Sequence, residues 1–177
     1  QLADLGARVE TLALPQSTEA YGAMVGRLIG AESYPIVGAL VDDPALPLDD
    51  DVRPRIQLGR DMTASDYLRL LRDREAHKRN ALLALDGFDA WLTPTTVTPA
   101  LPVAEVDQTT TPARFTRPLN FLDWCALALP CGFTDGGLPL SLQISCRGHD
   151  EATALRIGWA YQQATDWHRR VPPGLDD

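Results

Sequence analysis

Cys131 stands between a proline and a glycine, shortly before a glycine turn, and a cysteine in such a place could act as a nucleophile. A catalytic thiol needs a base within hydrogen-bond distance and an electropositive setting, because the thiolate is the reactive form. The histidines, His77, His149 and His168, fall in helical or helix-flanking segments, and the sequence pairs none of them with Cys131. We therefore favour a packing residue at the end of a buried strand, with a thiol hydrolase as the alternative.

The other candidate nucleophiles and ligands also lack an activating partner. Lys78, the single lysine, lies among charges in REAHKRN, whereas a lysine base must be desolvated to lower its pKa, so we predict a solvated helix face. Cys146 and His149 supply at most half of a tetrahedral zinc site, and we expect no metal. TDGG (134–137) is typical of a turn and not of a phosphate loop, so no cofactor is expected. None of the serines stands in a G-x-S-x-G or S-x-x-K pattern: Ser17, Ser33, Ser65, Ser141 and Ser145.

Two hydroxyl residues, Thr95 and Thr96, lie in the proline-spaced loop TPTTVTPA, just after a short expected strand. Ligands of open α/β sheets bind beyond the carboxyl ends of strands. Both residues are therefore candidates for lining a cleft, although hydroxyls that only stabilise a turn explain the pattern equally well.

The elements that must position these residues alternate between strands and helices. The best helix is expected at 63–88, with Thr63 as its cap, Asp66 in the reciprocal position and Gly87 as its end. Pro and Asp dominate 35–55, which predicts loop. Such alternation predicts an α/β fold with at least some parallel strand pairing. The further expected helices are 17–34, 114–124 and 150–168, and the expected strands are 7–15, the start of 89–102, 125–130 and 138–145.

The composition indicates one globular unit and narrows the range of partners. The 177 residues are 45% hydrophobic and 23% charged, which suffices for one core. The formal net charge of −8 argues against nucleic acid. We see no apolar run long enough to span a membrane, and an odd number of cysteines favours a reducing cytoplasm. Because the chain starts at Gln1 inside a helix-like pattern, we expect a fragment.

Four stretches, in order, resemble the C-terminal portion of an enzyme of the amidase signature family. That resemblance implies an α/β fold with a mixed β-sheet flanked by helices. It also implies that residues 1–177 are the C-terminal part of a single domain whose N-terminal catalytic half is absent. The stretches are VRPRIQLG (52–59), DAWLTPTTVTPA (89–100), FTRPLNFLDWCALALPCGFTDGGLPLSLQI (115–144) and DEATALRIGWAYQQATDWHRRVPP (150–173).

The same resemblance implies how the whole enzyme would work. In this family a serine nucleophile, a bridging serine in a cis peptide and a lysine base lie in the N-terminal half, on a Gly/Ser-rich segment that this chain lacks. No catalytic residue is therefore expected here. Arg55 in RPRIQLG matches an arginine that, in amidotransferase A subunits, helps to hold the substrate's carboxylate; pairing with Asp49–Asp51 is the equal alternative. The implied substrate-binding residues are Arg55, Thr95, Thr96, Thr116 and Asn120.

The sequence also departs from the family pattern. Ala113 replaces an aspartate of the amidotransferases, which favours a general amidase, and Ser141 replaces a glycine. Further departures are Asp123, Cys125 and Ala128.

These observations lead to one main hypothesis and its alternatives. We expect part of an amidase, with a non-catalytic binding or assembly subunit or part of a tRNA-dependent amidotransferase A subunit as the alternatives. The expected partners are a small amide substrate and the N-terminal half, with a homodimer as a further option and with no nucleic acid and no membrane.

Overall fold

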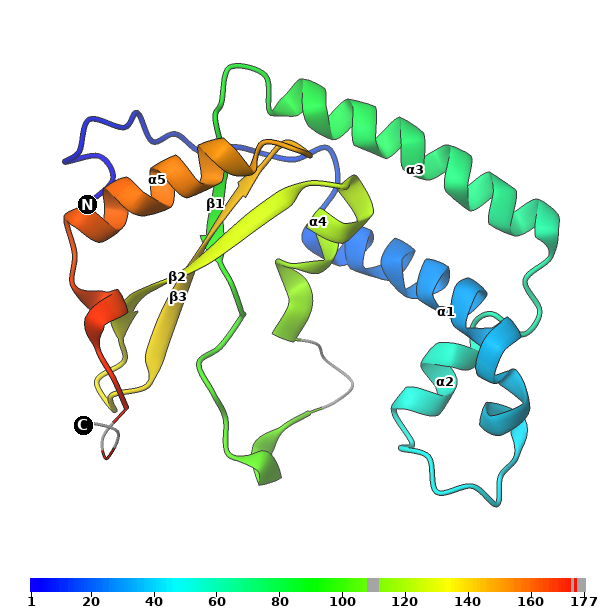
Figure 1. Cartoon of the computed structure of the whole chain (residues 1–177). Helices are drawn as coiled ribbons and strands as arrows, with labels where there is room; N and C mark the ends of the chain where they lie inside the picture. The colour runs from blue at the N-terminus through cyan, green and yellow to red at the C-terminus, as the bar shows by residue number, and fades with distance from the viewer. Residues whose placement is uncertain (108–111, 173, 175–177) are drawn as a thin grey trace.

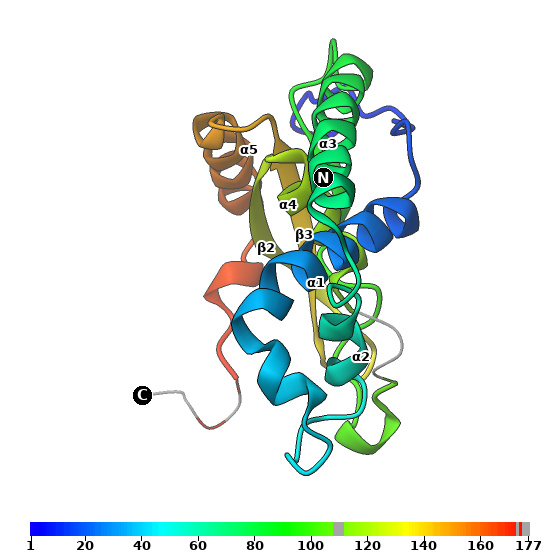
Figure 2. The same ribbon diagram turned by 90° about the vertical axis from the view of Figure 1, so that its right-hand side faces the viewer.

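The computed structural model describes residues 1–107, 112–172 and 174, and it arranges them as layers (Figure 1). Figure 2 shows the strands between α5 on one side and the helices α1 and α3 on the other. Pro173 and residues 175–177 of the expected tail lie outside the described residues. The α-helices are α1 (Thr18–Asp42), α2 (Val52–Gln57), α3 (Ala64–Ala84), α4 (Arg117–Leu122) and α5 (Glu151–Gln163). The strands are β1 (Trp91–Pro94), β2 (Cys125–Phe133) and β3 (Pro139–Cys146), and the short 3₁₀ turns are Val103–Glu105, Pro112–Arg114 and Trp167–Arg169.

The three strands form one sheet in the order β1-β3-β2, with both pairings antiparallel. The α/β class is confirmed, but the expected parallel pairing is wrong for the described strands. A short turn joins β2 to β3, and strands so joined must pair antiparallel. The strand β1 and the strand that follows it, β2, do point the same way, but β3 lies between them.

Two separate clusters of buried side chains hold the layers together. One joins α1, α3 and α4 around Tyr21, Leu85 and Phe121. The other joins the sheet to α5 through Leu129, Ile144 and other apolar side chains. The helices α1, α3 and α5 therefore each bury one face and leave the other exposed.

The N-terminal segment and the region after residue 34 differ from their expected structures. Residues 7–15 form no strand: Leu12 and Leu14 pack against the first core, but their backbone has no strand partner. The helix α1 continues through Pro35 to Asp42, and α2 follows, so the loop expected at 35–55 is wrong over most of its length. Figure 2 shows that α1 bends before its end, as proline-containing helices do.

Tertiary contacts explain why α1 continues in spite of its proline. Arg53 donates to the carbonyl oxygens of Asp43 (3.0 Å) and Leu46 (2.9 Å), and also to that of Val41 at the end of the helix. The Val41 carbonyl is among the last of α1, which have no partner within the helix. A distant arginine therefore stabilises an end that local sequence alone would place earlier.

The helix α1 is also long and apolar enough to cross a membrane, judged by length and composition only. The expectation that no such run exists is therefore wrong for this segment. In the structure, α1 packs against α2, α3 and α4.

The ends of α3 follow the sequence prediction. The Thr63 hydroxyl accepts a hydrogen bond from the Asp66 backbone N–H (3.1 Å), and the Asp66 carboxylate accepts one from the Thr63 N–H (3.3 Å). Gly87 follows the helix with φ +79°, a conformation that favours glycine. The expected helices 17–34, 114–124 and 150–168 correspond to α1, α4 and α5, although the last two are shorter than expected.

The packing of α1 on the turn after α2 leaves no room for a side chain at Gly59. A Cβ atom there would lie 2.0 Å from the Gly30 carbonyl oxygen. We expect Gly59→Ala to lower the free energy of unfolding by roughly 3 kcal/mol, because backbone would have to move. In the matched variant Gly26→Ala, the Cβ would meet nothing within 4 Å, so a gain of about 0.5–1 kcal/mol is expected. Chemical denaturation of both variants measures the difference, and equal stability of the two would contradict this packing.

Candidate functional site

The loop Thr96–Ala100 separates two cavities that share it as a common wall. The larger, of about 1260 Å³, lies between this loop and α1. We call it the arginine groove, because Arg27, Arg55, Arg114 and Arg117 line it. The smaller, of about 610 Å³, lies at the end of the sheet beside Thr95, Cys131 and Ser141; we call it the neutral pocket.

Charges of both signs line the arginine groove. Glu19, Glu105 and Asp107 accompany the arginines. Arg114 forms an ion pair with Glu19 and donates to the Thr18 hydroxyl at 3.1 Å. The pKa of the Glu19 carboxyl is lowered, first by the hydrogen bond from its own backbone N–H and more weakly by Arg114. The four guanidinium groups outnumber the three carboxylates among the described lining residues, so the groove can attract an anionic group.

Two of the expected substrate-binding residues line the arginine groove. Arg55, on α2, is half-buried there. Thr96 lies on the dividing loop and lines both cavities, with its hydroxyl donating to the Thr98 carbonyl at 2.9 Å. The Thr96 hydroxyl thus stabilises the loop, which is the role that the turn-stabilising alternative gave to the hydroxyls of TPTTVTPA.

Thr95 lies on the other side of the loop, in the neutral pocket. Its backbone N–H donates to the Ser141 carbonyl at 3.0 Å, and the two side-chain hydroxyls lie 2.8 Å apart. Ser141, which replaces a glycine of the family pattern, therefore ties the start of the loop to β3.

Neither Thr116 nor Asn120 is among the described residues that line the two cavities. The Thr116 hydroxyl donates to the Ala113 carbonyl at 3.3 Å, at the start of α4. The Asn120 side chain is exposed and reaches the Thr116 carbonyl at 3.5 Å. Both side chains thus make local contacts within and beside α4.

Cys131 occupies a bulge in β2, where the register with β3 shifts between Pro130 and Gly132. The side chain is half-buried, and burial raises the pKa of its thiol. Among the described residues it makes no hydrogen bond, and His77 lies instead against the rings of Tyr21 and Phe121. A protonated, unpaired thiol is the wrong form for a nucleophile.

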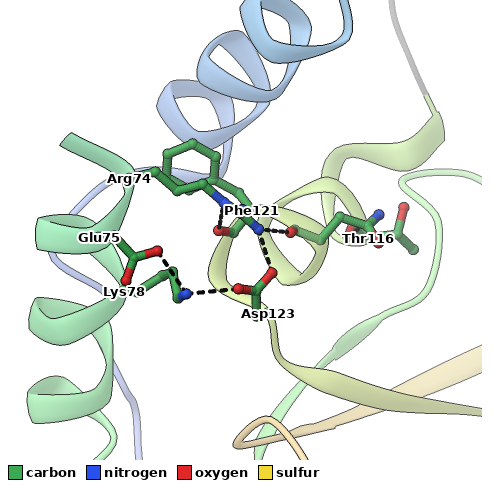
Figure 3. A network of polar contacts seen from close by, with 7 residues as sticks. Arg74, Glu75, Lys78, Thr116, Phe121 and Asp123 are labelled. Carbon is green, nitrogen blue, oxygen red and sulfur yellow. Dashed lines mark hydrogen bonds and ion pairs between the residues drawn. The ribbon is translucent and has the colours of Figure 1, made fainter. Parts of the chain in front are cut away.

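Lys78 is held in a network of ion pairs between α3 and α4 (Figure 3). Its Nζ lies 2.8 Å from Glu75 and 2.7 Å from Asp123, and its side chain is only 23% exposed. The expectation of a solvated helix face is therefore wrong in part. The hydrogen bonds to Asp123 and Glu75 raise the pKa of the ammonium group, so Lys78 cannot act as a neutral base.

Arg74 completes this network at the end of α4. It donates to the carbonyls of Phe121 (2.7 Å) and Asn120 (2.9 Å) and pairs with Asp123. Asp123 follows the helix with φ +56°. Burial raises the pKa of its carboxyl, but Lys78 and Arg74 lower it by more, so the net shift is downward.

Gln143 is a positioning residue that the sequence prediction missed. Its buried amide donates to the Thr93 hydroxyl (3.1 Å) and to the Phe115 carbonyl (3.0 Å). The sequence signal that could have identified Gln143 is a polar amide in the middle of an apolar strand. No group of three or more residues suited to a metal ion comes together in the part of the chain that the structure describes.

Comparison with protein families gives a match to the family described as Amidase over residues 1–155. Similar curated proteins are glutamyl-tRNA(Gln) amidotransferase A subunits. The one from Synechococcus sp. (strain JA-2-3B'a(2-13)) is 37% identical over 131 residues, which cover 70% of this chain and 26% of that protein. The one from Chloroflexus aggregans is 38% identical over 133 residues, which cover 69% and 27%. The chain thus spans about a quarter of the length of these relatives.

Solved structures of similar fold cover nearly the whole chain. A crystal structure of an amidase has a TM-score of 0.78 at 25% identity. The alignment covers 92% of this chain and 39% of the amidase chain. A bacterial aryl acylamidase of the amidase signature family has a TM-score of 0.73 at 21% identity, covering 94% and 38%. The similarity to the aryl acylamidase shows a shared fold.

The ion pairs of Asp123 predict a small, pH-dependent contribution to stability. We expect Asp123→Asn to lower the free energy of unfolding at pH 7 by roughly 0.5 kcal/mol, because the carboxylate is half exposed and screened by solvent. Asparagine tolerates the left-handed backbone at this position, so the change isolates the charge.

The sign of the pH dependence follows from the lowered pKa. The contribution of Asp123 is present above its ordinary value of 3.8 and is lost as pH falls through the lowered pKa of the folded state. Denaturation of both proteins between pH 7 and pH 2 should therefore show the difference shrinking only at the acid end. A constant difference over that range would argue against the ion pairs.

Proposed function

Because this chain belongs to the amidase family, we propose that it forms the C-terminal portion of an amidase that hydrolyses a carboxamide to a carboxylate and ammonia. In this proposal the catalytic residues lie outside the chain, and the chain contributes one wall of the substrate pocket. The observation that carries the proposal is the arginine groove, where Arg55 and the TPTTVTPA loop, two of the four family-like stretches, line one cavity.

The proposed reaction is acyl transfer through a serine. The hydroxyl of the serine nucleophile attacks the amide carbon and passes its proton through the bridging serine to the lysine. The amide nitrogen then takes up this proton from the lysine as the C–N bond breaks, and it leaves as ammonia. Water hydrolyses the acyl-enzyme to the carboxylate. The state of Lys78 and Cys131 supports placing this chemistry elsewhere, because one is ion-paired and the other lacks a base.

Within this reaction the chain would bind and orient the substrate. The guanidinium of Arg55 can hold a carboxylate through two parallel hydrogen bonds, which fixes orientation as well as position. Arg27 and Arg117 add positive charge to the same groove. The amides we propose as substrates therefore carry an acidic group.

The second candidate is part of the A subunit of a tRNA-dependent amidotransferase. The names of the similar curated proteins favour it. Ala113, where those enzymes have an aspartate, weighs against it. A cytoplasmic location, a homodimer and a purely non-catalytic role remain predictions of the sequence.

The first test joins this chain to an upstream half that carries a Gly/Ser-rich segment and a lysine. We expect no hydrolysis by the chain alone and release of ammonia from an amide panel by the assembled pair. Replacing the upstream lysine by alanine should abolish the activity. A soluble, assembled complex that hydrolyses no amide would count against the amidase and favour the binding subunit.

The second test changes Arg55 in the same assembled enzyme. We expect Arg55→Leu to raise KM for amides that carry a carboxylate by roughly 10- to 100-fold, since a charge-assisted hydrogen bond contributes about 1.5–3 kcal/mol. Amides without an acidic group should change little. Arg79→Leu, an exposed position on α3 away from the groove, is the matched control. Equal effects on both kinds of amide would contradict the proposed role of Arg55.

A further inference from the structure

We propose that the neutral pocket is a second binding site, which takes an uncharged, largely apolar small molecule that carries a carbonyl acceptor. This goes beyond the proposed amide hydrolysis, because the pocket lies across the dividing loop from the arginine groove. Its volume of about 610 Å³ lies within the usual range for sites that hold drug-sized ligands.

The lining of the pocket determines the ligand's charge. Among the described residues that line it, none carries a charge, although nearly a quarter of the whole chain does. Leu92, Leu140 and Leu142 supply apolar surface from β1 and β3. An ion would lose its hydration in such a pocket without gaining a partner, whereas a neutral apolar molecule gains by leaving water.

The hydroxyl pair at the rim determines the polar group of the ligand. The Thr95 and Ser141 oxygens lie 2.8 Å apart, so one hydroxyl donates to the other. The hydrogen of the accepting hydroxyl is then free, because each hydroxyl carries one hydrogen. A carbonyl oxygen of the ligand can accept it, and the pair fixes where that donor lies.

The bulge at Cys131 places a thiol in the same pocket. A bulge redirects the side chain of the extra residue away from the regular pleat, and bulges often lie beside functional sites. The raised pKa of this thiol keeps it uncharged, in accord with the rest of the lining. Cys131 therefore serves as a built-in reporter of occupancy.

The first measurement uses 6-propionyl-2-dimethylaminonaphthalene, a neutral fluorophore with one carbonyl. We expect the chain to bind it with a blue shift of its emission. Cys131→Phe should fill the pocket and weaken binding by at least about tenfold, while Cys131→Ala should leave the pocket open and preserve binding. The double variant Thr95→Val/Ser141→Ala, which removes both hydroxyls, should weaken binding by about three- to tenfold, the effect of losing one hydrogen bond.

The second measurement follows the thiol itself, in a Cys125→Ser background. Serine keeps the hydrogen bond that the Cys125 side chain donates to the Arg147 carbonyl. Cys146 is fully buried with its pKa raised to about 11, so Cys131 is the remaining reactive thiol. Saturating fluorophore should slow the modification of Cys131 by methyl methanethiosulfonate several-fold, as read by mass spectrometry.

The outcomes separate this site from the arginine groove. Loss of binding in Ile29→Trp, which fills the groove, with no loss in Cys131→Phe would overturn the proposal. So would an absence of binding, or binding that leaves the thiol unprotected. If Cys131→Phe does not fold, the Thr95→Val/Ser141→Ala variant and thiol protection decide, and neither measurement depends on hydrolytic activity.

Discussion

The carbonyl groups at the ends of three helices are held by arginine side chains that come from other elements. Arg53 holds the end of α1, Arg74 holds the end of α4, and Arg147 of the segment after β3 donates to the Leu85 (2.8 Å) and Phe88 (3.0 Å) carbonyls after α3. A helix end leaves its last carbonyls without partners and carries partial negative charge. A planar guanidinium with five donors satisfies several of them at once.

Some of these bonds couple the two cores, and others strengthen the helical core that forms part of the groove. Arg147 reaches from the sheet to the end of α3, and Arg74 reaches from α3 to α4. Gln143 adds a link from β3 to the segment before α4. The walls of the arginine groove come from α1, α2 and the loop after β1, so its shape depends on the packing of these elements as well as on the long-range hydrogen bonds.

The loop after β1 gives the two cavities different chemistry. The side that meets α1 faces arginines and carboxylates, while the side that meets β3 faces hydroxyls, a thiol and leucines. Prolines on the loop and the bond between Thr95 and Ser141 hold this short segment in place. One rigid wall can therefore serve a charged site and an uncharged one.

Local features of the sequence determined the ends of α3, the turn between β2 and β3, and the α/β class. A capping box, a glycine in a left-handed conformation and a hydrophobic period all act within a few residues, so they can be recognised without the rest of the chain. The family-like stretches likewise indicated Arg55 and the TPTTVTPA loop. Both line the groove, although their role in binding is still a proposal.

Only the tertiary structure decided the features that depend on distant partners. Arg53 bonds carbonyls at and just beyond the end of α1, past Pro35, β3 lies between the parallel strands β1 and β2, and Asp123 holds Lys78 in an ion pair. It also placed Thr116 and Asn120 away from the cavities and Cys131 in a bulge. The physical reason is the same in each case: strand pairing, helix-end bonds and burial are set by atoms far apart in the chain, which no local pattern records.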